Sequence, residues 1–190
     1  MEARDRVQLR IVLVLSRQDL AILDRSGANG NAAKGGYILK DTEGDLDLVL
    51  LATGSEVELA VLAQADLKER GVNARVVSLP SWEIFEEQGA DWKAEVLGPE
   101  GTPRVSIEAS VTLGWSRYTG ANGAQVGIDT YGASGPGKAV LKLYGMTTEH
   151  VAATALRLLG RGDEADTVDA DYRQGQETAG QAVSGADGHS

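Results

Sequence analysis

Hydrophobic and polar positions divide the chain into short apolar runs and longer amphipathic stretches. Residues 10–15 (RIVLVL) and 47–52 (DLVLLA) are apolar runs of the kind found in strands that are covered on both faces. Shorter runs, each bounded by turn-forming residues, predict further strands. These lie at about 37–41, 73–79, 102–109 and 123–131.

Amphipathic stretches between the strands predict helices. Residues 55–70 place apolar side chains on one face, Gly71 stops the helix, and Ser55 with Glu58 predicts a capping box. Shorter helical regions are expected at 81–88 and 90–97. The last two helices are expected at 135–144 and 148–159, with Ser134 and Thr147 as N-caps.

Strands and helices alternate along the chain, which predicts an α/β fold with a mostly parallel sheet. Residues 24–36 (DRSGANGNAAKGG) are polar and glycine-rich, as in a linker or surface loop. After residue 160 the pattern ends, large apolar side chains are scarce, and the net charge of the remainder is −5. We therefore predict a disordered acidic tail over 160–190.

Composition narrows the classes of function. The 190 residues are 42% apolar and carry a net charge of −10, which argues against nucleic acid as a partner. No apolar run is long enough to span a membrane. The chain has no cysteine, which excludes disulfides and thiolate chemistry and suits a cytoplasmic protein.

The stretch GASGPGKAV, residues 132–140, differs by one residue type from the phosphate-binding loop of nucleotide hydrolases. Ala139 stands where that loop has the Ser or Thr that holds magnesium, and Pro136 removes one amide donor. These two residues argue against a nucleotide site. They favour a tight turn that leads into a helix.

Four other positions are candidates for chemistry. The turn at 52–57 could hold an anion at the start of a helix, although the predicted capping box is the better explanation of its sequence. Arg17, in the motif SRQ after the first strand, could grip a phosphate or form a surface ion pair. Glu108 could act as an acid or base or pair within the fold, and His150 is expected to pack or lie at the surface.

Several segments resemble transketolases in their order and spacing, over roughly residues 11–159. They are LVLSRQDL, AAKGGYILKD, DLVLLATGSEVELAVLA, ARVVSLPSWEIFEEQ, RVSIEAS and GIDTYGASGPGKAVLKLYGMTTEHV. The resemblance implies a three-layer fold with a five-stranded, mostly parallel sheet that has one antiparallel strand. It also implies four parts: a remnant of the middle, pyrimidine-binding domain (1–25), a linker (26–36), the C-terminal domain (37–159) and the tail (160–190).

Transketolases are homodimers that transfer a two-carbon ketol unit from a ketose phosphate to an aldose phosphate. They use thiamine diphosphate with Mg or Ca, in the pentose phosphate pathway or in carbon fixation. The resemblance implies that Arg17 contacts the phosphate of the sugar substrate. It assigns no catalytic, cofactor-binding or metal-binding residue to this segment, because those groups lie upstream in the family.

The chain alone is therefore expected to lack catalysis and to pack against the remaining transketolase domains within a homodimer. Two alternatives stay open. One is a stand-alone anion- or nucleotide-binding module at 52–55 or 132–138. The other is the C-terminal subunit of a split transketolase.

Overall fold

The computed structural model describes residues 12, 18–28, 30–170, 172 and 174–175. Its centre is a five-stranded sheet in the order β1-β3-β2-β4-β5. β1 is antiparallel to β3 and the other neighbours are parallel, which confirms the predicted mixed α/β sheet. The strands are β1 (Tyr37–Lys40), β2 (Leu48–Ala52), β3 (Ala74–Ser78), β4 (Arg104–Ile107) and β5 (Ala124–Val126). The strand predicted at 10–15 lies outside the described residues apart from Val12.

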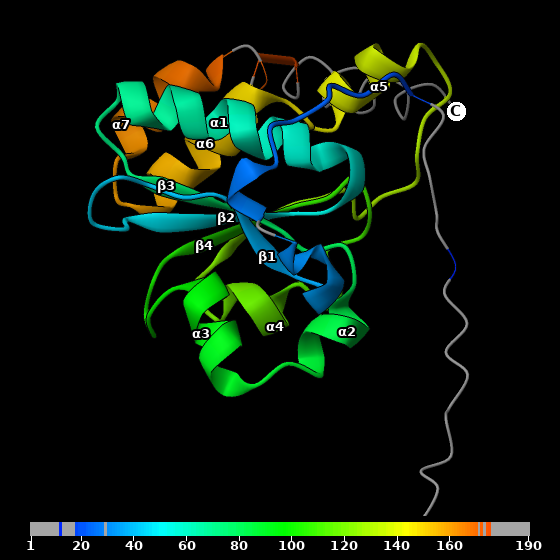
Figure 1. The fold of residues 1–190 in the computed structure, drawn as a ribbon. Helices are drawn as coiled ribbons and strands as arrows, with labels where there is room; N and C mark the ends of the chain where they lie inside the picture. Colours follow the sequence, from blue (N-terminus) through cyan, green and yellow to red (C-terminus); the bar gives the residue numbers. More distant parts are fainter. Residues whose placement is uncertain (1–11, 13–17, 29, 171, 173, 176–190) are drawn as a thin grey trace, which may run out of the picture.

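Helices cover both faces of the sheet and complete three layers (Figure 1). One face carries α1 (Val57–Glu69), α6 (Thr148–Leu158) and α7 (Gly162–Val168). The other face carries α2 (Trp82–Glu86), α3 (Ala90–Leu97) and α4 (Ser116–Thr119). A further helix, α5 (Gly137–Leu143), extends beyond the end of the sheet, and short 3-10 turns lie at η1 (Ser26–Ala28), η2 (Asn31–Lys34) and η3 (Gly54–Glu56).

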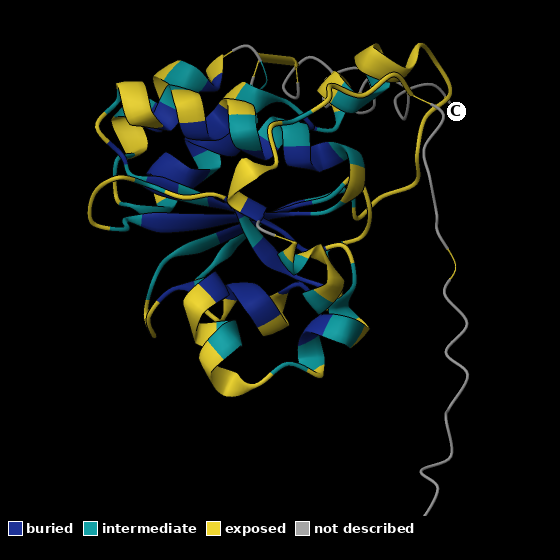
Figure 2. Ribbon diagram, viewed as in Figure 1, coloured by how far each residue is buried: buried dark blue, intermediate teal, exposed yellow. Residues whose placement is uncertain are grey.

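β2 is buried along its whole length, as its unbroken apolar sequence predicts. Leu48, Leu50 and Ala52 pack into the core beneath α1 and α6. Val49 and Leu51 point to the opposite face and pack into the second core. The dark central strands in Figure 2 show this burial, and the sheet therefore forms a rigid base for the loops at its ends.

Two of the predicted helix starts can be compared directly. Thr147 caps α6 by accepting a hydrogen bond from the backbone N–H of His150 over 3.2 Å, which confirms that prediction. The prediction that Ser134 caps the preceding helix is wrong. Because α5 begins only at Gly137 and Pro136 occupies its N-cap, Ser134 lies too far upstream to reach the first amides.

The prediction of a disordered tail from residue 160 is wrong for its first part, because residues 162–168 form α7. Ala165 is fully buried against α6. Asp169, with only 1% of its side chain exposed, accepts from Arg157 of α6. Composition missed this helix because few apolar residues, Ala165 and Val168, pack on the core, and pairs of charged side chains with other helices complete the contact.

The predicted linker, residues 26–36, contains η1 and η2 and packs against the domain through Gly35 and Gly36, which lie close to Phe85. The domain boundaries stay predictions. No helix in the described part of the chain is long and apolar enough to cross a membrane.

Candidate functional site

The carboxyl ends of β2, β4 and β5 lie at one edge of the sheet, because these three strands are parallel. Ligands of open α/β sheets collect at this edge. Three candidates from the sequence follow these strands in the chain: the turn at 52–57, Glu108 and the loop at 132–138. Ser55 and Glu56 of the turn line one cavity together with Lys138.

The N-terminal segment also reaches this edge. Nε2 of Gln18 donates to Oγ of Ser55 over 3.3 Å, at the turn after β2. An open cavity of about 650 Å³ lies between this segment and α5. Its lining residues are Gln18, Asp19, Ala133, Gly135, Gly137, Lys138, Val140 and Leu141. Arg17, the predicted phosphate ligand, lies outside the described residues, and its role stays a prediction.

The turn after β2 does not form the predicted capping box. Oγ of Ser55 donates to Oε1 of Glu56 over 2.6 Å and accepts from Gln18, so it does not cap the helix. The turn η3 comes first, and α1 begins at Val57 without a side-chain cap. Ser55 therefore lies inside η3, and its hydroxyl takes part in other hydrogen bonds instead of an N-cap.

The loop at 132–137 is an exposed turn that leads into α5. The backbone amides of Ala139 and Val140 both donate to the carbonyl of Pro136, over 2.9 and 3.1 Å. Two of the amides that a phosphate-binding loop would aim at its ligand are thus used inside the helix. This geometry agrees with the turn that the sequence favours.

Glu108 pairs within the fold. Its Oε2 accepts from the indole Nε1 of Trp115 over 2.7 Å. Trp115 lies edge-to-face with Trp82, with the ring centroids 5.0 Å apart. The carboxylate therefore fixes an aromatic cluster beneath the edge of the sheet, and this is its role in the described structure.

The same cluster contains Tyr118, whose ring lies 5.2 Å from that of Trp82. Burial raises the pKa of Tyr118 to about 12, and the neighbouring carboxylate of Glu86 adds to the effect. Lys93 forms an ion pair with Glu86 over 2.7 Å and holds the pKa of that carboxyl below its ordinary value.

His150 has the packing role that was expected. Its Nδ1 lies 3.0 Å from the carboxylate of Asp169, and its ring packs at 4.1 Å from that of Tyr172. Among the described residues no group of three or more His, Cys, Asp or Glu side chains could hold a metal ion.

A family model described as the transketolase-like TK C-terminal domain matches residues 35–147 of this chain. The match spans the sheet from β1 to β5 and continues through α5. The chain belongs to this transketolase C-terminal domain family.

Complete transketolases are among its relatives. The enzyme of Halalkalibacterium halodurans is 47% identical over 149 residues, which are 77% of this chain and 22% of the relative. Transketolase 1 of Escherichia coli is 46% identical over 148 residues, again 77% of this chain and 22% of the relative. The chain thus spans about a fifth of the length of these transketolases and corresponds to their C-terminal part.

Solved transketolases share the fold. A Pichia stipitis transketolase in complex with sedoheptulose 7-phosphate is 40% identical, with a TM-score of 0.69 over 76% of this chain and 20% of that chain. The Leishmania mexicana transketolase is 40% identical, with a TM-score of 0.66 over 72% of this chain and 20% of that one. A split-gene transketolase, an inactive β4 tetramer, is 21% identical, with a TM-score of 0.53 over 68% of this chain and 44% of that chain. At this identity the likeness shows the fold alone.

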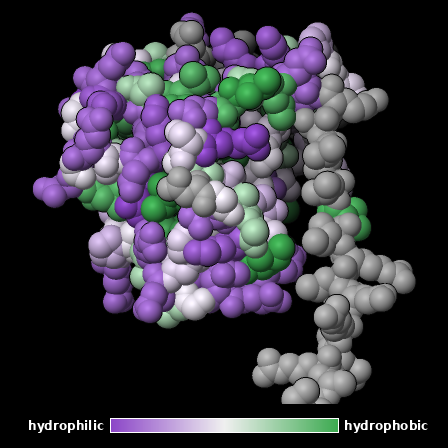
Figure 3. All heavy atoms as spheres, in the orientation of Figure 1, coloured by the Kyte–Doolittle hydropathy of each residue, from purple (hydrophilic) through white to green (hydrophobic). Residues whose placement is uncertain are grey.

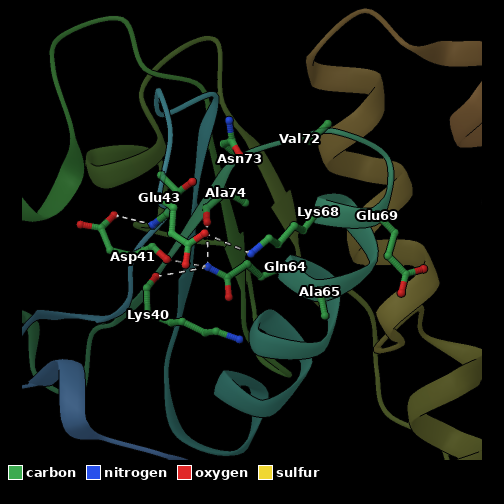
Figure 4. Close-up of a pocket in the computed structure, with 11 residues that line it drawn as sticks. Lys40, Asp41, Glu43, Gln64, Ala65, Lys68, Glu69, Val72, Asn73 and Ala74 are labelled. Atoms are coloured by element: carbon green, nitrogen blue, oxygen red, sulfur yellow. Dashed lines mark hydrogen bonds and ion pairs between the residues drawn. The ribbon is translucent and has the colours of Figure 1, made fainter.

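The opposite edge of this transketolase C-terminal domain holds a second cavity, of about 440 Å³ (Figure 4). Nε2 of the buried Gln64 on α1 donates to the carbonyl of Ala74 over 2.8 Å and reaches those of Lys40 and Asp41 over 3.4 and 3.5 Å. The pairing of β1 with β3 shifts register just before Lys40. Gln64 therefore joins α1 to β3 and to the end of β1 through hydrogen bonds to backbone carbonyls.

Sequence reasoning missed Gln64 and Asp169. Both are polar residues with a side chain buried by partners from distant segments. The only sequence signal for Gln64 is its position on the apolar face of α1, between Ala63 and Leu67. Asp169 gave no such signal, because the last helix lacks an apolar stripe.

Proposed function

We propose that this chain works as the C-terminal part of a transketolase, an enzyme that moves a two-carbon ketol unit between sugar phosphates. The observation that carries the proposal is the family match over 35–147, together with complete transketolases that are 46–47% identical. A chain that spans about a fifth of these enzymes performs their reaction only together with the remainder.

Thiamine diphosphate, with Mg or Ca, supplies the carbanion stabilisation in the proposed enzyme. We propose that the divalent ion and the cofactor are held by other parts of the enzyme; among the described residues, no group of three or more His, Cys, Asp or Glu side chains could hold a metal ion. We propose that the preceding domains bind the cofactor and carry out the ketol transfer.

A sugar phosphate is the proposed substrate, and Arg17 is the residue that we propose for its phosphate. Pichia stipitis transketolases have been crystallised with xylulose 5-phosphate, fructose 6-phosphate and sedoheptulose 7-phosphate, which supports this class of substrate. The described neighbour of Arg17, Gln18, lies at the carboxyl edge of the sheet, where ligands of this fold class gather. We further propose that the parent enzyme is a cytoplasmic homodimer.

A hybrid enzyme tests the proposal. In the Halalkalibacterium halodurans transketolase, the region that matches this chain is replaced by the chain. Ketol transfer is then measured with xylulose 5-phosphate as donor. The hybrid should retain turnover, whereas the same transketolase cut short before this region should be inactive. A folded hybrid that binds thiamine diphosphate but shows no turnover would contradict the proposal.

The split-subunit alternative stays open, because the chain spans about a fifth of the transketolases that it matches. Adding the isolated chain to the shortened transketolase distinguishes the two cases, because only a split subunit restores turnover without a covalent link. The stand-alone binding module predicts heat on calorimetric titration with ATP or a sugar phosphate, and the paired amides of Ala139 and Val140 weigh against it.

A further inference from the structure

Two exposed runs at the carboxyl edge of the sheet contain no charged residue. They are residues 109–114 (ASVTLG), after β4, and residues 130–137 (TYGASGPG), before α5. Charged residues make up 24% of the chain, so their absence from both runs sets this surface apart. We call residues 109–114 and 130–137 the carboxyl-edge surface.

Large apolar side chains project from the carboxyl-edge surface. Leu113 is 81% exposed, Val111 is 51% exposed and Tyr131 is 98% exposed. Depletion of charge together with exposed aromatic and aliphatic side chains is the composition of the central part of a protein–protein interface. The face seen in Figure 3, by contrast, is mostly hydrophilic, with a hydrophobic patch over α1 and the N-terminal segment that crosses it.

The first run is held in one conformation. Asp129 accepts from the backbone N–H of Thr112 over 2.8 Å and from its hydroxyl over 2.9 Å. The N–H of Ile128 donates to the carbonyl of Ser110 over 2.8 Å. A Cβ on Gly127 would lie 2.6 Å from Cγ2 of Thr112, so the packing there admits no side chain. The exposed Leu113 is thus displayed by an ordered loop, which lowers the entropy cost of binding.

The position of the N-terminal segment indicates which partner covers this surface. Gln18 shares a cavity with Ala133, Gly135 and Gly137 of the second run. The Halalkalibacterium halodurans transketolase is about 4.5 times longer than the region that matches this chain. The remaining polypeptide of such an enzyme is available to cover the carboxyl-edge surface. Residues 18 and 19 of the N-terminal segment thus lie beside the second run of the carboxyl-edge surface.

We propose that the carboxyl-edge surface is where this domain docks onto the preceding part of the transketolase polypeptide. The inference rests on the proposed function, and it adds the surface through which the two parts meet. The partner is an apolar protein surface that receives Leu113, Val111 and Tyr131.

Hydrogen exchange tests the inference in the full chain and in the hybrid transketolase. Amides of 109–114 and 130–137 should exchange about 10-fold or more slowly in the hybrid than in the isolated chain. The loop at 98–102, which precedes β4 at the opposite edge, is the internal control and should exchange equally in both. Protection elsewhere without protection of the two runs would overturn the inference while leaving the proposed function intact.

Substitutions provide a second readout. Leu113→Ser and Tyr131→Ser should leave the melting temperature of the isolated chain unchanged, and should abolish the protection of 109–114 and 130–137 in the hybrid. Leu62→Ser, at a half-exposed position on α1, is the matched control. If Leu62→Ser abolished the protection of 109–114 and 130–137 to the same extent, the assignment of the surface would be overturned. The assignment would also be overturned if the isolated chain formed a dimer and Leu113→Ser dissociated it. A second copy of the chain would then be the partner.

Discussion

Nη1 of Arg157 donates to Oδ2 of Asp169 over 3.0 Å, and this ion pair joins α6 to the residue that ends α7. The carboxylate is 1% exposed and also lies 3.0 Å from Nδ1 of His150. α7 is thus joined to α6 through the buried carboxylate of Asp169. Arg157 and His150, both on α6, are the hydrogen-bond partners of this carboxylate.

Asp169→Ala should destabilise the chain by about 2–3 kcal/mol, because it leaves Arg157 and His150 without their shared acceptor. Urea unfolding of the isolated chain measures this loss. Asp166→Ala is the matched control, since Asp166 pairs with the same arginine but is 52% exposed, and it should cost less than about 1 kcal/mol. Equal losses would show that burial of the pair does not anchor α7.

Gly35→Ala should destabilise the chain far more than Gly30→Ala, although both residues have φ of 77°. A Cβ at Gly35 would lie 2.5 Å from the backbone N of Phe85 and the carbonyl O of Ser81, whereas one at Gly30 would meet nothing within 4 Å. Gly30→Ala should cost about 1–2 kcal/mol from the left-handed backbone alone. Thermal melts of both variants measure the difference, and similar melting temperatures would contradict the packing at Phe85.

Stability should fall as the pH rises from 10 toward 12, because Tyr118 keeps its proton longer when folded than when unfolded. The pKa of Tyr118 is raised to about 12 in the fold, so its contribution is complete below pH 10 and is lost as the pH passes through 12. Tyr118→Phe should flatten the pH dependence of the urea midpoint over this range. An equal fall of the urea midpoint in Tyr118→Phe between pH 10 and pH 12 would contradict the assignment to Tyr118.

Arg17→Ala in the hybrid transketolase should raise the KM for xylulose 5-phosphate by about 10- to 100-fold, the loss expected for a charged hydrogen bond to phosphate. Arg25→Ala, at an exposed arginine in the same segment, should leave KM unchanged. An unaltered KM in Arg17→Ala would remove the only substrate contact that we assign to this chain.

The hydrophobic pattern predicted the sheet well because β2 is apolar on both faces and meets a core on each. Thr147 was predictable as a cap because its partner, the N–H of His150, is three residues away. Local patterns succeed where the interaction itself is local.

The parts that the sequence did not predict depend on distant residues. Nε2 of Gln18 donates to Oγ of Ser55 from 37 positions away, and the expected capping box does not form. Asp169, after α7, pairs with Arg157 of α6, and Gln64 on α1 reaches the carbonyl of Lys40 at the end of β1. For the candidate site, the sequence left Glu108 either as an acid or base or as a group paired within the fold, and only the structure shows that Trp115 donates to it.

The most direct test of the central claim, that this domain depends on other segments for its chemistry, is a ketol-transfer assay of the isolated chain beside the hybrid transketolase. Both receive thiamine diphosphate, Mg²⁺, xylulose 5-phosphate and an aldose phosphate acceptor. We predict turnover by the hybrid and none by the isolated chain. Turnover by the isolated chain would contradict the account.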